Sequence, residues 1–472
     1  MRARARGRRG AAPPLAALVL ASLQLVAGCG GGAAPPAGGE EPTPPNLLVL
    51  YCDDLRFDAG SALGSAFLPT PALDRLAREG AVFRRSYATT SRCAPSRATF
   101  LTGTRASTHG VWVNRPTHDW RAGQPFLPAE LRAAGYATGW VGKWHLPNPG
   151  SARPEGLDHF ASYEGPGAHF DQEFVVDGVP RPTAGFQAEV LTDLALEFID
   201  GREDPWFLVV AHKAPHVPLT PAPAQRGALD SVEVPLPLTV ADPLEALPPR
   251  YRLAREGESG RHGIGDLAAW RAEVQAYWEL VLGVDAAVER LLEGLEARGQ
   301  LQRTVVVLTS DNGQLLGEHG LRQKGLAYEP AIRVPLVVWA PGRIPSGDRL
   351  TLALNLDLAP TLLGLAGCPA TPGMEGLDLG PSLRDAGRVL RERFLYQAPS
   401  LGGAEGLVER AVVEARWKYL SFESPQGRDE ALFDLEADPH ERVDLAADPG
   451  TAAERARLAA WMAAERARIG DS

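Results

Sequence analysis

Two clusters of oxygen-bearing side chains stand out in this sequence of 472 residues, because each directly follows a short apolar run. Asp53-Asp54 follows Leu47 to Tyr51, and Asp311-Asn312 follows Val305 to Leu308. Carboxylates that converge on one point repel each other unless a cation lies among them. Oxygen ligands without histidine or cysteine favour calcium or magnesium over zinc. The alternative is that these residues are turn residues or helix caps, which Asp and Asn often form at strand ends.

A second chemically suggestive segment runs from Ser91 to Gly103. Pro95 suits the first turn of a helix, and Gly103 suits its end. Cys93 would then stand just before a helix N-terminus, where free amides and the helix dipole favour anions. Arg97 lies one turn further along and can reach the same anion. A cysteine near a helix start, taken alone, is usually a packing residue.

The stretch Cys93-Ala94-Pro95-Ser96-Arg97, followed by Leu101-Thr102-Gly103, resembles the signature of the type I sulfatases of the alkaline phosphatase superfamily. The resemblance implies that a separate formylglycine-generating enzyme oxidises Cys93 to formylglycine. In that family the aldehyde hydrates to a geminal diol. One hydroxyl attacks sulfur, and the other later expels sulfate as the aldehyde re-forms.

Further stretches resemble the same family in the same order, roughly from Asn46 to Leu445. They are Asn46 to Asp54, Gly142-Lys143-Trp144-His145, Lys213-Ala214-Pro215-His216, Thr309-Ser310-Asp311-Asn312-Gly313, Lys324 with Tyr328-Glu329-Pro330 and Arg333-Val334-Pro335, and Leu432-Phe433-Asp434-Leu435 with Asp438-Pro439 and Glu441. The resemblance implies one calcium ion per chain, with ligands from Asp53, Asp54, the modified Cys93, Asp311 and Asn312. The catalytic residues that it implies are Cys93, Arg97, Lys143, His145, His216 and Lys324.

Hydrolysis of a sulfate monoester explains why one site would need these residue types. Negative charge on the non-bridging and departing oxygens is stabilised by fixed positive groups and a metal. Lys143, Lys324, Arg97 and the cation would supply that charge. His216 is our candidate for the general acid, with Lys324 assisting at the leaving oxygen, and His145 is our candidate for the base. The alternative for the two lysines is an ordinary exposed loop position.

The elements that must position these groups are predicted by short apolar runs followed by polar residues. Runs rich in β-branched residues are typical of strands buried on both faces. Besides the two runs above, they are Ala137 to Val141, Trp206 to Val210 and Val334 to Trp339. Helical patterns between them span Pro71 to Glu79, Pro128 to Ala134, Glu189 to Ile199 and Leu267 to Arg298. The alternation predicts an α/β protein with a large, mostly parallel mixed sheet, whose ligands bind at the carboxyl ends of the strands.

The pattern changes after about Leu379. Phe394 to Tyr396, Ala411 to Glu414 and Trp417 to Ser421 predict short antiparallel strands, and Thr451 to Ile469 predicts an amphipathic helix. We therefore predict a signal peptide over 1–28, a flexible tether over 29–45, a catalytic domain over 46–379 and a smaller C-terminal subdomain over 380–472. The segment Pro223 to Arg261 carries no motif that we can assign.

The N-terminus predicts export. Arg2 to Arg9 form a basic region, and the apolar stretch from Leu15 to Ala27 is too short for a transmembrane helix. Leu25 to Cys29 resembles a bacterial lipobox, which implies cleavage before Cys29 and lipidation of its thiol. A cell-envelope lipoprotein in the periplasm or at the cell surface follows from this interpretation. The alternative is an ordinary secretory signal with an incidental cysteine.

Composition limits the partners. The net charge of -10 disfavours nucleic acid and anionic lipid, so contact with a membrane is expected only through the lipid anchor. Three cysteines besides Cys29 are too few and too scattered for a disulfide framework. The expected partners are a sulfated small molecule or glycan as substrate and the formylglycine-generating enzyme during maturation.

Two other functions remain open from the sequence. A phosphate or phosphonate monoester hydrolase would share the fold, although many such enzymes bind transition metals through histidine, where this chain has Asn312. A catalytically inactive surface lipoprotein that binds sulfated glycans would not need a nucleophile. The roles of several residues also stay open between the substrate pocket and plain structure: His109, His118, His212, Glu318, His319, Trp112, Trp120 and Trp144.

Overall fold

The computed structural model describes residues 44–114, 122–147, 153–248, 251–252, 264–399, 408–424 and 427–471. The predicted signal, lipobox and most of the tether, together with His118 and Trp120, lie outside these residues. Pro44–Ser472 forms one compact unit of contacts. In the described residues, no helix combines the length and the apolar character that a membrane span requires.

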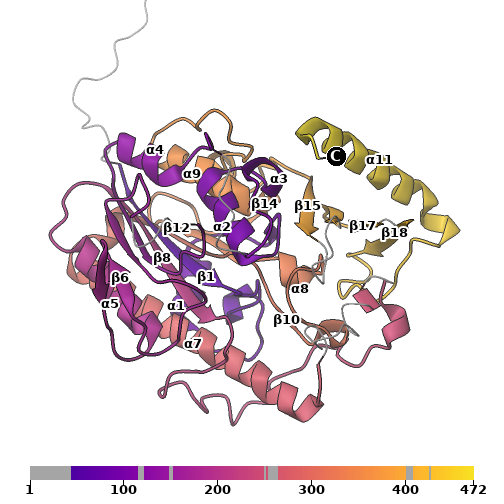
Figure 1. Cartoon of the computed structure of the whole chain (residues 1–472), viewed down its shortest axis with the longest axis horizontal. Coiled ribbons are helices and arrows are strands. Elements are labelled where there is room, and N and C mark those ends of the chain that lie inside the picture. The colour runs from indigo at the N-terminus through magenta and orange to yellow at the C-terminus, as the bar shows by residue number, and fades with distance from the viewer. Residues whose placement is uncertain are drawn as a thin grey trace, which may run out of the picture. The chain divides into compact units, whose positions relative to one another are not determined.

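The main sheet has ten strands in the order β13-β2-β12-β9-β1-β8-β4-β5-β6-β7. Figure 1 labels β12, β1, β8 and β6 of this sheet. Their bounds are β1 Asn46–Asp53, β2 Ala81–Phe83, β4 Ala137–Gly142, β5 His159–Ser162, β6 Phe174–Val176, β7 Val179–Arg181, β8 Trp206–Pro215, β9 Thr304–Ser310, β12 Leu336–Trp339 and β13 Gly347–Arg349. The central strands β9, β1, β8, β4 and β5 are parallel to one another. All five apolar runs predicted as strands lie in this sheet, so the predicted mostly parallel mixed sheet is confirmed.

The strand β12 runs antiparallel to its neighbours β9 and β2. After β9 the chain stays beyond the carboxyl end of the sheet, through β10 (Leu315–Leu316), β11 (Arg322–Gln323) and the short helix α8 (Glu329–Ile332). It then enters β12 from that same edge. Parallel pairing would have required a crossover to the opposite edge, so the direct return reverses the strand.

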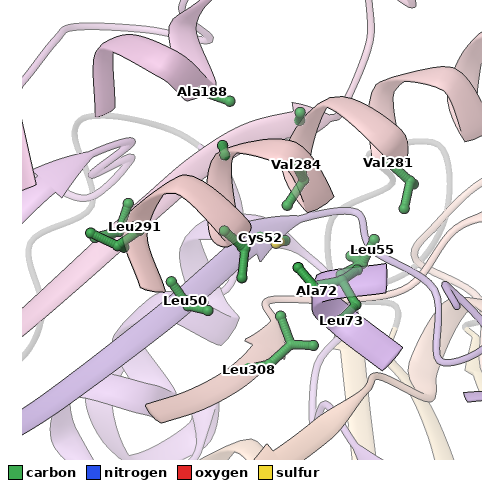
Figure 2. Packing of buried hydrophobic residues seen from close by; sticks show 14 of the residues in the cluster. Leu50, Cys52, Leu55, Ala72, Leu73, Ala188, Val281, Val284, Leu291 and Leu308 are labelled. Carbon is green, nitrogen blue, oxygen red and sulfur yellow. The ribbon is translucent and has the colours of Figure 1, made fainter. Parts of the chain in front are cut away.

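Alternating side chains of β1 divide the core into two layers. Leu48, Leu50 and Cys52 pack against the helices α1 (Pro71–Glu79), α5 (Gln187–Ile199) and α7 (Leu267–Ala297). Figure 2 shows Val284 and Leu291 of α7 lying over Leu50 and Cys52 of β1. Successive residues of a strand point to opposite faces, which explains this segregation.

The other face of the sheet packs against a second set of helices. Leu47, Val49 and Tyr51 lie in a cluster with apolar residues from each of these helices. The helices are α2 (Cys93–Thr102), α4 (Leu127–Ala133), α9 (Leu358–Leu365) and α10 (Gly380–Arg384). Both faces of β1 are therefore buried, as its uninterrupted apolar sequence predicts.

A second sheet lies in the C-terminal part of the chain. It has the order β15-β16-β17-β18, with bounds Arg393–Pro399, Val408–Glu414, Trp417–Ser424 and Gly427–Asp434, and all pairs are antiparallel. One face packs on residues that follow β9, and the other packs on Leu458 and Met462 of the helix α11 (Ala452–Ile469). The predicted antiparallel strands and closing helix are confirmed. The boundary at Leu379 remains an interpretation of the sequence.

Candidate active site

The two predicted clusters of oxygen ligands meet because β1 and β9 are adjacent parallel strands, with Cys52 opposite Ser310. The backbone amide of Asp54 donates to Oδ1 of Asp311 at 3.2 Å, and Nδ2 of Asn312 donates to Oδ1 of Asp54 at 2.7 Å. Asp54 has a φ of 70°, which turns the chain sharply at the end of β1. The side chains of Asp53, Asp54 and both β9 cluster residues are buried.

The helix α2 places Cys93 beside these carboxylates. Cys93 is the first residue of the helix rather than the residue before it, and Gly103 ends the helix with a φ of 63°. One ligand atom from each of Asp53, Asp54, Cys93 and Asp311 can be chosen such that all lie within 4.8 Å of one another. The thiol is thus next to the oxygen cluster at a helix N-terminus, where partial positive charge is available to an anion.

Arg97 connects this helix to both clusters of oxygen ligands, the one after β1 and the one after β9. Its Nε and Nη2 lie 3.0 and 2.8 Å from Oδ2 of Asp311, and its Nη2 lies 3.8 Å from Oδ1 of Asp53. Nη1 donates to the backbone oxygen of Lys143 at 2.6 Å. The guanidinium is fully buried. Arg97 therefore holds three segments of the site together and supplies positive charge to its floor.

Lys143 and His145 follow the strand β4. At Gly142 the φ is 109°, and a Cβ atom would lie 2.1 Å from the backbone oxygen of Ala211. Any residue other than glycine would therefore clash with β8 at this position. This close turn directs the Lys143 ammonium into a short contact with Oδ2 of Asp53. Burial and the nearby Lys143 lower the pKa of His145 to about 3, so its imidazole is neutral near pH 7.

His216 reaches the site from the end of β8. Its Nε2 lies 3.9 Å from Oδ2 of Asp54, and one of its ring nitrogens lies within 4.8 Å of ligand atoms of Asp53 and Cys93. Its Nδ1 donates to the backbone oxygen of Val217 at 2.7 Å. Burial would lower the pKa of His216, but Asp53 and Asp54 outweigh it and the pKa is raised.

Lys324 closes the site from the segment that follows β11. Its Nζ lies 3.0 Å from Sγ of Cys93 and makes a short contact with Oδ1 of Asp54. Burial would lower the pKa of Lys324, but Asp54 and Cys93 hold it well above its usual range. The pKa of the Cys93 thiol is lowered, because Lys143, Lys324 and His216 outweigh burial and Asp53.

The carboxylates carry the features expected of a cation site. Burial and Asp53 raise the pKa of Asp311 well above its usual range despite Arg97, because two carboxylates share a buried space. Within the described residues, Oδ1 of Asp53 and Oδ1 of Asn312 are buried without a hydrogen-bond partner. Unpartnered buried oxygens next to repelling carboxylates fit a hard divalent cation. The donor set therefore suits a cation such as calcium or magnesium.

Several residues with open roles are structural. His109 bonds with Oγ1 of Thr99 at 3.0 Å and accepts from the amide of Val111 at 3.1 Å. Trp144 packs edge-on against Trp140 and Phe160 in the core. These contacts place His109 and Trp144 in the scaffold rather than on a sugar-binding surface.

His212 and the Glu318-His319 pair also differ from the catalytic groups. His212 is buried, and burial lowers its pKa to about 4. Glu318 pairs with Arg56, and His319 stacks on Tyr328 with ring centroids 4.4 Å apart. None of these residues is among the groups that converge on Cys93 in the described part of the chain.

Two residues that support the site were not predicted from the sequence. Asn114 accepts a hydrogen bond from the amide of Ala94 at 3.0 Å and so caps the helix that carries Cys93. The hydroxyl of Tyr277, on α7, donates to the backbone oxygen of Asp54 at 2.7 Å. Both act through contacts between distant segments, and the sequence offers no local signal for either.

A separate cavity of about 530 Å³ lies between the loop after β1 and the C-terminal sheet. Phe57, Trp278, Arg333 and His440 are among its lining residues, and none of the predicted catalytic or metal residues lines it. It is therefore distinct from the site around Cys93.

Comparison with known proteins agrees with this geometry. Residues 45–368 match the sulfatase family, and residues 317–468 match the C-terminal region of N-sulphoglucosamine sulphohydrolase. The chain belongs to the sulfatase family. This sulfatase is therefore a sulfuric ester hydrolase, and the alternative of an inactive glycan-binding lipoprotein is not supported.

Curated relatives cover most of this sulfatase. It is 30% identical over 473 residues to an N-acetylglucosamine-6-O-sulfatase of Bacteroides thetaiotaomicron, a match that covers 85% of this chain and 82% of the relative. It is also 30% identical over 450 residues to a choline-sulfatase of Rhizobium meliloti, with 88% and 85% covered. Equal identity to relatives named for such different substrates means that identity alone does not define the substrate.

Solved structures share the fold. One protein in complex with its substrate D-glucosamine-2-N,6-O-disulfate has a TM-score of 0.81 at 26% identity, covering 91% of this sulfatase and 99% of that chain. A phosphonate monoester hydrolase of Agrobacterium radiobacter has a TM-score of 0.76 at 23% identity, covering 90% and 96%. The second likeness concerns the fold alone.

Proposed function

We propose that this sulfatase hydrolyses a carbohydrate sulfate through a formylglycine nucleophile made from Cys93, with calcium at the adjacent oxygen cluster. The observation that carries the proposal is the position of Cys93. Its Sγ lies at the start of a buried helix, 3.0 Å from Nζ of Lys324 and next to Asp53, Asp54 and Asp311. A structural cysteine would not need a lysine, an arginine and a carboxylate cluster around it.

Calcium would be held by Asp53, Asp54, Asp311, Asn312 and the modified Cys93 side chain, and it would supply positive charge to the sulfate oxygens and the nucleophile. The two unpartnered oxygens of Asp53 and Asn312 support this donor set. With Asn312 in place of the histidine expected for transition metals, the set favours a sulfatase over the phosphate or phosphonate hydrolases.

The hydrated aldehyde of formylglycine supplies one hydroxyl that attacks sulfur and a second whose deprotonation expels the bound sulfate. An unmodified thiol has no second hydroxyl and would stop at the covalent stage. Maturation therefore requires the formylglycine-generating enzyme, which would read Cys93 to Arg97 before folding buries this segment.

The remaining residues fall into two groups, those that stabilise negative charge and those that transfer protons. Arg97, Lys143 and Lys324 are fixed positive groups that stabilise charge on the sulfate and leaving oxygens. We assign His216 to donate its Nε2 proton to the leaving oxygen, and the raised pKa of its imidazole supports this role. We assign His145 to accept a proton from the nucleophile, and its low pKa, which keeps the imidazole neutral, is consistent with that role.

The proposed substrate class is a sulfated carbohydrate of the amino-sugar type. It is supported by the relative named for N-acetylglucosamine 6-O-sulfate and by the neighbouring structure with bound D-glucosamine-2-N,6-O-disulfate. Release of sulfate from 4-nitrophenyl sulfate, choline sulfate and N-acetylglucosamine 6-sulfate tests this proposal. We expect turnover of the aryl and sugar sulfates and a higher kcat/KM for the sugar than for choline sulfate.

Two controls accompany this assay. Cys93→Ala is expected to fold and to retain calcium, because four oxygen ligands remain, yet to release no sulfate. Faster turnover of 4-nitrophenyl phosphate or a phosphonate ester than of every sulfate ester would instead favour a phosphate or phosphonate monoester hydrolase.

We also propose that the protein is exported and held at a membrane by a lipid on Cys29. The basic region, the apolar stretch and the lipobox-like Leu25 to Cys29 support this proposal. Cys29→Ser should move the protein from the membrane fraction to the soluble fraction. A protein that is already soluble before the substitution would refute the anchor.

A further inference from the structure

Lys213 is a buried lysine beside the active site that none of the proposed chemical steps uses. It lies on β8, three residues before His216, and its side chain is buried. Its ammonium donates to the backbone oxygen of Val217 at 2.8 Å and lies 3.5 Å from Nδ1 of His216. Burying an ammonium costs stability unless it gains hydrogen bonds or counter-charges. Burial lowers the pKa of Lys213 to about 8.

The contacts of Lys213 help to fix the orientation of the His216 imidazole. The backbone oxygen of Val217 accepts from Nζ of Lys213 and also from Nδ1 of His216, at 2.7 Å. Nδ1 is thus the donor in this bond, and the other ring nitrogen, Nε2, faces Asp54 at 3.9 Å. The backbone oxygen of His216 is itself held by Nε2 of His169 at 2.7 Å.

We propose that Lys213 is a positioning residue that, through the Val217 carbonyl, holds the His216 imidazole with Nε2 directed at the leaving oxygen. The inference rests on the proposed role of His216 as general acid. The His216 side chain is 18% exposed, so packing alone leaves its ring room to move. Loss of the ammonium would leave the carbonyl free to shift and the ring free to turn, and a displacement of about 1 Å can cost on the order of 10²-fold in rate.

The leaving group determines how much such a displacement matters. A 4-nitrophenolate departs as a stabilised anion and needs little help from an acid. An unsubstituted phenolate is more basic, so proton transfer to it contributes more to the transition state. A residue that positions the acid must therefore affect phenyl sulfate more than 4-nitrophenyl sulfate, whereas a merely structural residue affects both equally.

The test measures kcat and KM for these two aryl sulfates with the wild type, Lys213→Met and Lys213→Arg. We expect the kcat of Lys213→Met to fall on the order of 10²-fold with phenyl sulfate and less than about threefold with 4-nitrophenyl sulfate, at unchanged KM. Lys213→Arg, which can still donate to the Val217 carbonyl, should lose less. The ratio of the two rates on one preparation does not depend on the fraction of folded enzyme.

A double substitution shows whether Lys213 acts through His216. In a His216→Ala background, Lys213→Met should not reduce phenyl sulfate turnover further. Equal loss with both substrates in the single variant, or an undiminished additional loss in the double variant, would overturn the positioning role. Failure of the wild type to turn over 4-nitrophenyl sulfate would instead contradict the proposed function, so the two failures are distinguishable.

Discussion

Replacing Lys418 with methionine should destabilise the fold more than any exposed ion-pair substitution. Lys418 is buried on β17, and its Nζ lies 2.7 Å from Oε1 of Glu441 and 2.9 Å from Oε1 of Glu329. It also donates to the backbone oxygen of Ala327 at 2.8 Å. One ammonium thus joins the C-terminal sheet to the segment that follows Lys324.

The expected cost follows from the two carboxylates that Lys418→Met leaves behind. Glu329 and Glu441 are each less than a tenth exposed, so neither can be hydrated as in water. Breaking a buried ion pair by removing one partner costs about 3–5 kcal/mol. That is a large part of the roughly 5–15 kcal/mol by which a typical domain is stable.

Urea denaturation with the midpoint and slope measured together is the appropriate assay. Arg181→Met is the matched control, because Arg181 pairs with Glu197 where the two side chains are 45% and 58% exposed. We expect the control to cost less than about 1 kcal/mol. Adding Glu441→Gln to Lys418→Met should recover part of the loss, since one stranded charge is removed.

The pH dependence of the loss provides a second check. Without the Lys418 ammonium, burial would hold the pKa values of Glu329 and Glu441 in the folded chain above their values in the unfolded chain. Their protonation then favours the folded state, so the deficit of Lys418→Met should shrink as the pH falls from 8 towards about 5. An unchanged urea midpoint, or a loss no larger than that of Arg181→Met, would refute the reasoning.

Other predictions concern pH, helix capping and the metal. Burial raises the pKa of Glu409 to about 7, against about 4.3 in an unfolded chain, so its contribution to stability falls by about 3–4 kcal/mol as the pH rises through that window; Glu409→Gln should flatten this part of a curve of urea midpoint against pH. Asp285 on α7 accepts from the amide of Leu73 at the start of α1, at 2.8 Å, so Asp285→Ala should cost about 1–2 kcal/mol in urea denaturation, whereas Asp285→Asn should retain most of the stability. Elemental analysis should find about one calcium per chain, and chelation should remove activity until calcium is restored; stoichiometric zinc with activity that survives chelation would contradict the site.

The sequence predicts the centre of the fold well because the chemistry lies at strand ends. The run Leu47 to Tyr51 followed by Asp53-Asp54 indicates both a buried strand and the place where its ligands emerge. The same reasoning holds for Val305 to Leu308 with Asp311-Asn312. Parallel neighbours in one sheet then bring such ends together, as the pairing of β1 with β9 shows.

Features built from long-range contacts could not be predicted. Lys213 belongs to a stretch that resembles the family, but its bond to the Val217 carbonyl depends on how the chain turns after β8. Lys418 lies in a predicted strand, and nothing near it in the sequence indicates that its partners are Glu329 and Glu441. Asn114 caps a helix from 20 positions away. In each case the side chain's role is set by a neighbour that only the folded chain supplies.

The segment from Pro223 also gains a role only in the structure. Oγ1 of Thr239 accepts from the amide of His319 at 3.0 Å, and Asp242 pairs with Arg442 at 2.9 Å. The described part of this segment therefore joins the loop after β9 to the C-terminal part of the chain. Contacts of this kind leave no motif in the sequence.

The central claim is that the nucleophile is formylglycine derived from Cys93, and mass spectrometry of the tryptic peptide from Cys93 to Arg97 tests it most directly. The peptide should come from a preparation whose sulfate release has been measured. We predict that it carries the aldehyde or its hydrate, in a fraction that rises in proportion to specific activity across preparations. A peptide with an intact thiol in a fully active preparation would contradict the account.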